Sequence, residues 1–226
     1  MSITACIFDW GGTLTPWHTV DPIDAWLAAT DGDAELARKL HEAERVVWGR
    51  HMSEQRSGTM DDIFEVADIA HTAEMLDAFH KWWEPHTYTD PDALDLLKGL
   101  RERNIKVGVL SNTVWPRAEH ERIFERDGLT DLIDGAVYTS DIAWTKPHPE
   151  AFRAALAAVA VDDPACAVFV GDRLYDDIHG AARVGMRTIL VPHSLIPPEQ
   201  VGEGTGEPDA TVERLADVLK VVDSWR

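Results

Sequence analysis

The ten residues Ala5–Leu14, ACIFDWGGTL, decide the fold of this chain. They begin with a short apolar run that predicts a buried strand, and Asp9 stands where this strand ends. Two glycines and a threonine follow at once, and glycine lets the backbone turn tightly and approach a ligand closely. A carboxylate in this position can serve as a metal ligand, as a nucleophile, or as both.

Three later segments supply further polar groups of the same kind. Residues 107–113, VGVLSNT, follow a buried-strand pattern that ends in small hydrogen-bonding side chains. Residues 144–149, WTKPHP, hold a lysine between loop signals, and residues 168–177, VFVGDRLYDD, end a strand with Gly-Asp before a second acidic pair. Together with Ala5–Leu14, these segments predict the parts of one site for phosphoryl transfer.

In this order, the four segments resemble the four motifs of the haloacid dehalogenase-like (HAD) hydrolase superfamily. The resemblance extends over about residues 3–191 and includes a helical insert after the first motif. It implies an α/β fold with a three-layer α/β/α, Rossmann-like core and a parallel sheet. HAD hydrolases similar to this chain carry a helical cap in the same place, where the cap closes over the site and selects the substrate.

Short apolar runs alternate with amphipathic stretches, which predicts β-α units around a mostly parallel sheet. Strands are expected at residues 3–8, 105–110, 135–139, 167–171 and 187–191, with a weaker one at 209–212. Core helices are expected at residues 91–103, 115–127, 148–160, 176–184 and 212–224. Residues 193–208 are rich in proline and glycine and are expected to form an exposed, mobile connection.

Residues 16–88 break this alternation, because they contain no strong strand pattern. Apolar residues recur there at helical spacing, namely Leu36, Leu40, Ala43 and Val47, and then Met75, Phe79 and Trp82 or Trp83. We therefore expect a helical cap domain at residues 16–88. It is inserted into an α/β core domain formed by residues 1–15 and 89–226.

The composition is that of a globular protein of 226 residues, which suits one core domain with a modest insertion. The net charge of −19 repels nucleic acid and anionic membranes. No apolar run approaches the ~20 residues that span a bilayer, and the N-terminus lacks a secretory signal. A cytoplasmic monomer or homodimer is expected, with no nucleic-acid or membrane partner. An anionic substrate then requires local positive charge from a metal ion, Lys146, and Arg173 or Arg117.

Matching the motifs residue by residue implies the catalytic group. Asp9 is the expected nucleophile, which forms an aspartyl-phosphate that water hydrolyses. Ser111 is expected to hold a phosphoryl oxygen, and Lys146 to neutralise Asp9 and the transition state. The expected contacts to the phosphoryl group and substrate come from Gly12, Thr13, Ser111, Asn112, Lys146 and Trp17.

The resemblance also implies a Mg²⁺ site, since magnesium prefers oxygen ligands. Asp9, the backbone carbonyl of Gly11 and Asp172 are the expected ligands. Asp177 completes the metal site by orienting a metal-bound water or Lys146, and Asp176 is the alternative residue for that task.

Gly11 departs from the pattern of the phosphatases in this family, which usually carry a second aspartate here. That aspartate protonates the leaving group and then activates water, and glycine has no side chain to do either. General acid–base catalysis contributes roughly 10²–10⁴ in rate, so an ordinary alkyl phosphate is expected to react slowly without a substitute. His18, Asp21 and His51 are candidate substitutes. Alternatively, the leaving group needs no acid, as in acyl phosphates, activated esters or a stabilised carbanion.

The leading hypothesis is a Mg²⁺-dependent hydrolase that acts on a small phosphorylated metabolite. A ligand-binding or regulatory protein with weak turnover is the alternative that Gly11 favours. The DWGGT wording of residues 9–13 is similar to that of phosphonoacetaldehyde hydrolases, but these need a cap lysine, and the expected cap offers only Lys39 and Lys81. Dehalogenases of this fold attack carbon without a metal and lack the acidic pattern of residues 168–177.

Overall fold

The computed structural model describes residues 2–192, 194–196 and 205–226. In this part of the chain, six strands form one sheet in the order β3-β2-β1-β4-β5-β6, and each neighbouring pair is parallel. The strands are β1 (Ala5–Phe8), β2 (Lys106–Ser111), β3 (Gly135–Tyr138), β4 (Ala167–Gly171), β5 (Arg187–Leu190) and β6 (Ala210–Thr211). All six lie where the sequence predicts them, with small shifts at their ends.

The central strands are fully buried, which is why they read as apolar runs in the sequence. Every residue of β1 and β4 is buried. Phe8, the last residue of β1, lies beside Val109 of β2 and Val170 of β4. The carboxyl ends of these three strands therefore meet where the strand order reverses, which is the place where open α/β sheets bind ligands.

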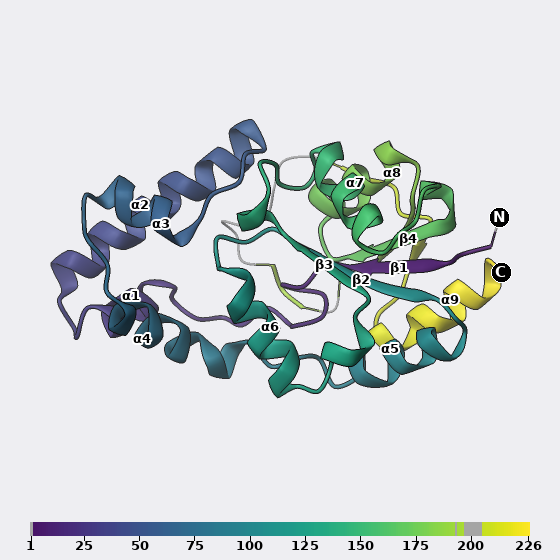
Figure 1. The fold of residues 1–226 in the computed structure, drawn as a ribbon, viewed down its shortest axis with the longest axis horizontal. Helices are drawn as coiled ribbons and strands as arrows, with labels where there is room; N and C mark the ends of the chain where they lie inside the picture. The colour runs from purple at the N-terminus through teal and green to yellow at the C-terminus, as the bar shows by residue number, and fades with distance from the viewer. Residues whose placement is uncertain (1, 193, 197–204) are drawn as a thin grey trace.

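Helices cover both faces of the sheet, so the core has three layers (Figure 1). The apolar cluster on one face includes residues of α5 (Ala93–Glu102), α6 (Arg117–Arg126) and α9 (Val218–Ser224). The cluster on the other face includes residues of α7 (Pro149–Ala158) and α8 (Gly180–Val184). The expected α/β/α arrangement is confirmed.

Short turns complete the core: η2 (Thr130–Leu132), η3 (Thr139–Asp141), η4 (Pro164–Cys166), η5 (Leu174–His179) and η7 (Leu215–Asp217). The helix expected at residues 176–184 begins earlier, because a π-helical turn, η5, precedes α8. The helix expected at residues 212–224 is wrong at its start, since α9 begins only at Val218. Of the connection expected at 193–208, residues 193 and 197–204 lie outside the described residues.

The chain between β1 and β2 is helical. It forms α1 (Ile23–Ala29), α2 (Ala34–Glu54), α3 (Met60–Ala67), α4 (Ala73–Trp83) and the 3₁₀ turn η1 (Glu84–His86). The apolar faces of these helices form a hydrophobic cluster of their own, with Trp26, Leu40 and Phe79 fully buried. This helical body lies at the left of Figure 1, beyond the carboxyl ends of the strands. Its division from the core as a domain of residues 16–88 stays a prediction.

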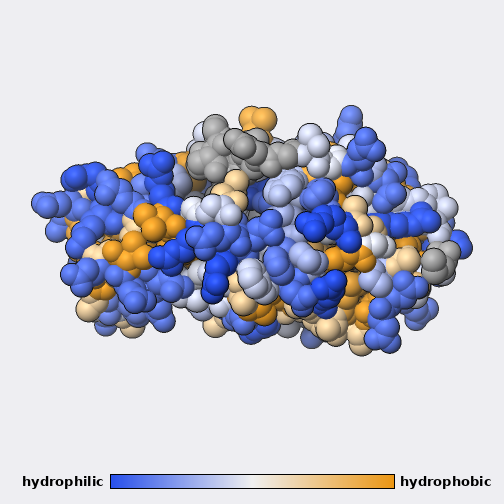
Figure 2. Space-filling view, turned by 90° about the horizontal axis from the view of Figure 1, so that it is seen from above, coloured by the Kyte–Doolittle hydropathy of each residue, from blue (hydrophilic) through white to orange (hydrophobic). Residues whose placement is uncertain are grey.

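The surface follows from the composition. The face seen in Figure 2 is mostly hydrophilic, and its apolar residues lie in separate patches. Among the described helices, none is both long and apolar enough to cross a membrane. Cys6 and Cys166 are both free thiols.

We predict that His120 of α6 weakens folding in mild acid. Its ring is fully buried and stacked on Tyr138, and burial lowers the pKa of His120 to about 3. The unfolded chain binds a proton at His120 below pH ~6.5, so the free energy of unfolding falls as the pH drops, by roughly 2 kcal/mol at pH 5. Urea titrations at pH 7.5 and pH 5 measure how much unfolding free energy is lost on acidification. This loss should be smaller in His120→Gln than in the wild type, by roughly 2 kcal/mol.

The matched control is His71→Gln, which removes an exposed histidine. An equal loss of unfolding free energy in His120→Gln and in the wild type would contradict the assignment.

Candidate functional site

The site is built where the carboxyl ends of neighbouring strands meet. Asp9 follows β1, Ser111 ends β2 and Asp172 follows β4. The backbone N–H of Asp9 donates to the carbonyl of Val170 at 2.9 Å, so strand pairing continues up to the site. Asp9, Ser111 and Asp172 are all buried, and their side chains are therefore held in defined places.

A buried ion pair network joins three of the sequence motifs. Lys146 Nζ lies 2.6 Å from Asp9 Oδ1 and 2.8 Å from Asp177 Oδ1, and all three side chains are buried. Burial alone would lower the pKa of Lys146, but the carboxylates of Asp177 and Asp9 outweigh it and raise the pKa. The ammonium group therefore stays charged beside Asp9.

Asp177 has both of its oxygens engaged. Oδ1 accepts from Lys146 Nζ, and Oδ2 accepts the backbone N–H groups of Asp172 at 3.1 Å and Arg173 at 3.0 Å. Asp176 instead accepts from Arg173 Nη1 at 3.2 Å. Of the two adjacent acids, Asp177 is thus the one that holds Lys146 and the turn after β4.

Asn112 fixes the backbone at Lys146. Its side-chain amide donates to the carbonyl of Lys146 at 3.0 Å, and its Oδ1 accepts the N–H of Lys146 at 2.8 Å. Asn112 also lines the cavity in front of Asp9. Its two amide atoms are occupied by the loop, so its clearest task is to hold Lys146 rather than to contact a substrate.

The loop after Asp9 is shaped around Trp17. Trp17 Nε1 donates to Asp172 Oδ2 at 2.7 Å. Gly12 has a φ of 87°, and a side chain there would overlap both Trp17 Nε1 and Asp172 Oδ2. The N–H of Gly12 donates to the carbonyl of Thr15 at 2.6 Å. Gly12 and the buried Thr13 are not among the described residues that line the cavity, so this geometry does not favour the phosphate contacts expected of them.

Gly11 leaves room for the same indole ring. A Cβ at Gly11 would stand 3.5 Å from Cη2 and 3.8 Å from Cζ2 of Trp17, which is ordinary van der Waals contact. The ring of Trp17 therefore fills the space next to the missing side chain. Gly11 itself lines the cavity beside Asp9.

The acidic residues form a group that could hold a metal ion. Asp9, Asp172 and Asp177 each place one oxygen within 4.8 Å of the others. Asp172 Oδ1 is buried and accepts no hydrogen bond from the described residues, which leaves it available to a cation. Four carboxylates, those of Asp9, Asp172, Asp176 and Asp177, face the two cations Lys146 and Arg173, so two negative charges are left uncompensated.

The pKa shifts report the same excess of negative charge. Burial raises the pKa of Asp9 to about 6, although the charge of Lys146 acts in the opposite direction. Burial, with the charges of Asp177 and Asp9, raises the pKa of Asp172 to about 8. A divalent cation would restore the charged form of both groups.

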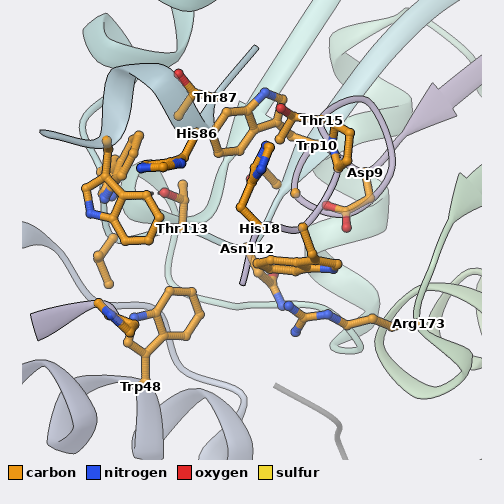
Figure 3. A pocket seen from close by; sticks show the side chains of 18 of the residues that line it. Asp9, Trp10, Thr15, His18, Trp48, His86, Thr87, Asn112, Thr113 and Arg173 are labelled. Carbon is orange, nitrogen blue, oxygen red and sulfur yellow. Dashed lines mark hydrogen bonds between the residues drawn. The ribbon is translucent and has the colours of Figure 1, made fainter. Parts of the chain in front are cut away.

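A cavity of about 180 Å³ extends from Asp9 to the helical insert. Its polar groups include Asp9, Ser111, Lys146, Arg173 and Asp176 at the core end and Glu44 at the far end. Its wall is aromatic, with Trp10, Trp17, Trp48, Trp83, Trp115, His18 and His86. In Figure 3, Trp48 lies across the cavity from Asp9, and Arg173 extends into the space between them. The predicted residues Asp9, Gly11, Trp17, Ser111, Asn112 and Lys146 thus share one cavity.

Several lining residues were not assigned to the site from the sequence. Arg173 was only one of two candidate sources of positive charge, and its position directly after Asp172 was the available signal. The other, Arg117, pairs instead with Asp141 and Glu121 and does not line the cavity. Nothing in the sequence distinguished Trp83 and Trp115 from ordinary core residues.

The structure shows which of the candidate proton donors and insert lysines line a cavity. His18 lines the cavity, whereas Asp21 does not. His51 lines a smaller neighbouring cavity of about 40 Å³, together with Lys146 and Arg173. Lys39 and Lys81 are exposed on α2 and α4 and line neither cavity.

Comparison with known proteins identifies the family. The model of the haloacid dehalogenase-like hydrolase family matches residues 3–185, and the chain belongs to this family. The expected membership is confirmed.

Two curated relatives are phosphatases by name. A glyceraldehyde 3-phosphate phosphatase from Methanopyrus kandleri is 26% identical over 97% of this chain and 97% of its own length. The enzyme of the same name from Pyrococcus abyssi is 32% identical over 65% of this chain, and the match covers 60% of that relative. Among solved structures, a 2-haloacid dehalogenase from Pseudomonas syringae is 25% identical over 99% of this chain and all of its own, with a TM-score of 0.66.

We predict that adjacent glycines respond differently to alanine. Gly12→Ala forces a side chain into a positive φ and against Trp17 and Asp172, and should lower the free energy of unfolding by about 2–4 kcal/mol. Gly11→Ala is the matched control and should cost less than about 1 kcal/mol, because its Cβ meets only an ordinary contact. Urea denaturation of both variants tests this, and similar costs would refute the described loop.

We predict that the acidic group binds a divalent cation. Millimolar MgCl₂ should raise the melting temperature of the wild type by a few degrees, and EDTA should reverse the rise. Asp172→Asn should lose most of this shift, because it removes a carboxylate whose Oδ1 accepts no hydrogen bond from the described residues. The control is Asp131→Asn, at an exposed position. A full shift in Asp172→Asn would count against the site.

Proposed function

We propose that this protein is a Mg²⁺-dependent phosphatase that hydrolyses a small phosphorylated compound through an aspartyl-phosphate. The observation that carries the proposal is the buried Lys146 between Asp9 and Asp177, with Asp172 beside them. A nucleophilic carboxylate, a fixed ammonium and an acidic cation site are the groups that phosphoryl transfer requires.

The residues divide the reaction between them. Asp9 attacks phosphorus through a carboxylate oxygen, the ester oxygen leaves with the bonding electron pair, and water then hydrolyses the aspartyl-phosphate. Lys146 offsets the charge of Asp9 and of the transferring group, and the hydroxyl of Ser111 holds a phosphoryl oxygen. Arg173, which also lines the cavity, adds a second cation for the phosphoryl oxygens.

Magnesium would be held by Asp9, Asp172 and the backbone carbonyl of Gly11. When bound, it supplies positive charge to the phosphoryl oxygens. Asp177 acts indirectly, because its oxygens hold Lys146 and the backbone N–H groups after β4. Trp17 keeps the other oxygen of Asp172 in place.

Several observations favour a phosphatase over the other activities of the family. The named relatives are phosphatases, and one matches nearly the full length of this chain. Dehalogenation needs no cation site, so the three clustered carboxylates argue against it despite the similar dehalogenase structure. Carbon–phosphorus cleavage needs a Schiff-base lysine from the helical insert, and both lysines of the insert, Lys39 and Lys81, are exposed outside the cavity. A cytoplasmic location and a monomer or homodimer remain part of the proposal.

The decisive variant is Asp9→Asn. An amide cannot attack phosphorus, so phosphate release from a panel of phosphorylated metabolites should fall by at least ~10³-fold. Asp131→Asn, at an exposed position, is the control and should keep wild-type turnover. Unchanged release in Asp9→Asn would end the proposal.

The same assay separates the alternatives. Chloride release from 2-chloropropionate without phosphate release would indicate a dehalogenase. Mg²⁺ binding without turnover of any substrate would favour the ligand-binding protein, which is the reading that Gly11 supports.

A further inference from the structure

The cavity beyond Asp9 has an unusually aromatic far wall. Trp48 of α2, Trp83 of α4 and Trp115 before α6 all line it. The ring centroids of Trp83 and Trp115 are 6.0 Å apart, and those of Trp10 and Trp115 are 5.9 Å apart. In an in-line displacement the leaving group lies opposite the attacking atom, which here is the side of Trp48 in Figure 3.

The volume of the cavity limits the size of that leaving group. The whole cavity, including the space in front of Asp9, holds about 180 Å³. A protein cavity of ~150 Å³ accommodates benzene. The space is therefore on the scale of a single ring beside the phosphoryl group.

The supply of a proton limits the chemistry of the leaving group. Gly11 provides no acid, and the ring of Trp17 fills the space beside it. The imidazole of His18 lines the cavity, but it contacts the ring of His86 and makes no hydrogen bond within the described residues. Within the described residues, no partner orients a proton of His18 toward the ester oxygen, as a partner of a catalytic histidine normally does. Two further carboxyl groups line the cavity, but Asp176 Oδ2 accepts from Arg173 Nη1 and Glu44 Oε2 accepts from Trp26 Nε1.

We propose that the substrates are aryl phosphate monoesters with a single ring. This rests on the proposed phosphatase function and names the substrate class of the same site. A phenol has a pKa near ~10, as in tyrosine, so its anion is a far better leaving group than an alkoxide. The aromatic wall and the missing acid thus point independently to the same compounds.

The reaction balances without an acid in the first step. A bond forms between an Asp9 carboxylate oxygen and phosphorus while the bond from phosphorus to the phenolic oxygen breaks. The phenolate leaves with the electron pair and takes its proton from solvent. Water then attacks phosphorus, which releases inorganic phosphate and regenerates the Asp9 carboxylate.

A cationic leaving group, such as choline, is the main competitor for a tryptophan-lined space. Glu44 is the acid at this end of the cavity, but its Oε2 accepts from Trp26 Nε1 at 2.8 Å and lies 3.5 Å from His41 Nδ1. This oxygen of Glu44 is therefore already engaged by partners within the protein.

The first test compares phenyl phosphate with cyclohexyl phosphate, which has a ring of similar size but an alcohol leaving group. Glycerol phosphate and phosphocholine complete the set. With wild-type protein and Mg²⁺, kcat/KM for phenyl phosphate should exceed that for each of the others by at least ~100-fold. Across substituted phenyl phosphates, kcat/KM, which reports the step that breaks the phenolic bond, should rise steeply as the pKa of the phenol falls.

The second test addresses the aromatic wall. Trp48→Ala should raise the KM for phenyl phosphate about tenfold, and Trp48→Phe should restore most of the loss. The control is Trp225→Ala, which removes a half-buried indole at the C-terminal end of the core.

The outcomes distinguish a failure of this inference from a failure of the proposed phosphatase function. If cyclohexyl, glycerol or choline phosphate is hydrolysed as well as phenyl phosphate, or if kcat/KM hardly depends on the phenol, the inference is overturned. Loss of that turnover in Asp9→Asn would still leave the phosphatase standing. Turnover of phenyl phosphate that survives Asp9→Asn would overturn both.

Discussion

The site depends on a lysine ammonium buried between two carboxylates. A charge removed from water is costly unless partners surround it, and losing one partner leaves the others exposed to that cost. Lys146 meets this constraint through Asp9 after β1 and Asp177 after β4, and Asn112 after β2 holds its backbone. One cation thus ties the ends of three strands together, and the nucleophile cannot shift without disturbing all of them.

The same network leaves the site deficient in positive charge. Lys146 and Arg173 face four carboxylates, and the raised pKa values of Asp9 and Asp172 are the consequence. Such an arrangement is poorly suited to bind a phosphate by itself. In the proposed phosphatase, a divalent cation at the acidic group would offset this deficit, so the cation and the substrate would act together in one electrostatic arrangement.

Sequence reasoning succeeded where a single physical rule decides the outcome. Buried parallel strands read as apolar runs, and the structure places oxygens of Asp9 and Asp172, at the carboxyl ends of two such strands, within 4.8 Å of each other. It did not predict the features that depend on local geometry. The choice between Asp176 and Asp177 follows from the turn after β4, and the N–H of Gly12 turns back to the carbonyl of Thr15. Trp115 faces the cavity, but its neighbours in sequence fit a core position equally well.

Gly11 and Trp17 form one structural feature, in which the indole of Trp17 takes the space beside the glycine. A protein that merely loses an acid leaves a space, whereas here an indole six residues later occupies the place beside the glycine. The same indole donates to Asp172, so its position serves the cation site as well as the cavity wall. Erosion of an unused site has no reason to build that contact while Asp9, Ser111, Lys146 and Asp177 all persist. The pairing therefore favours an enzyme adapted to a leaving group that needs no proton.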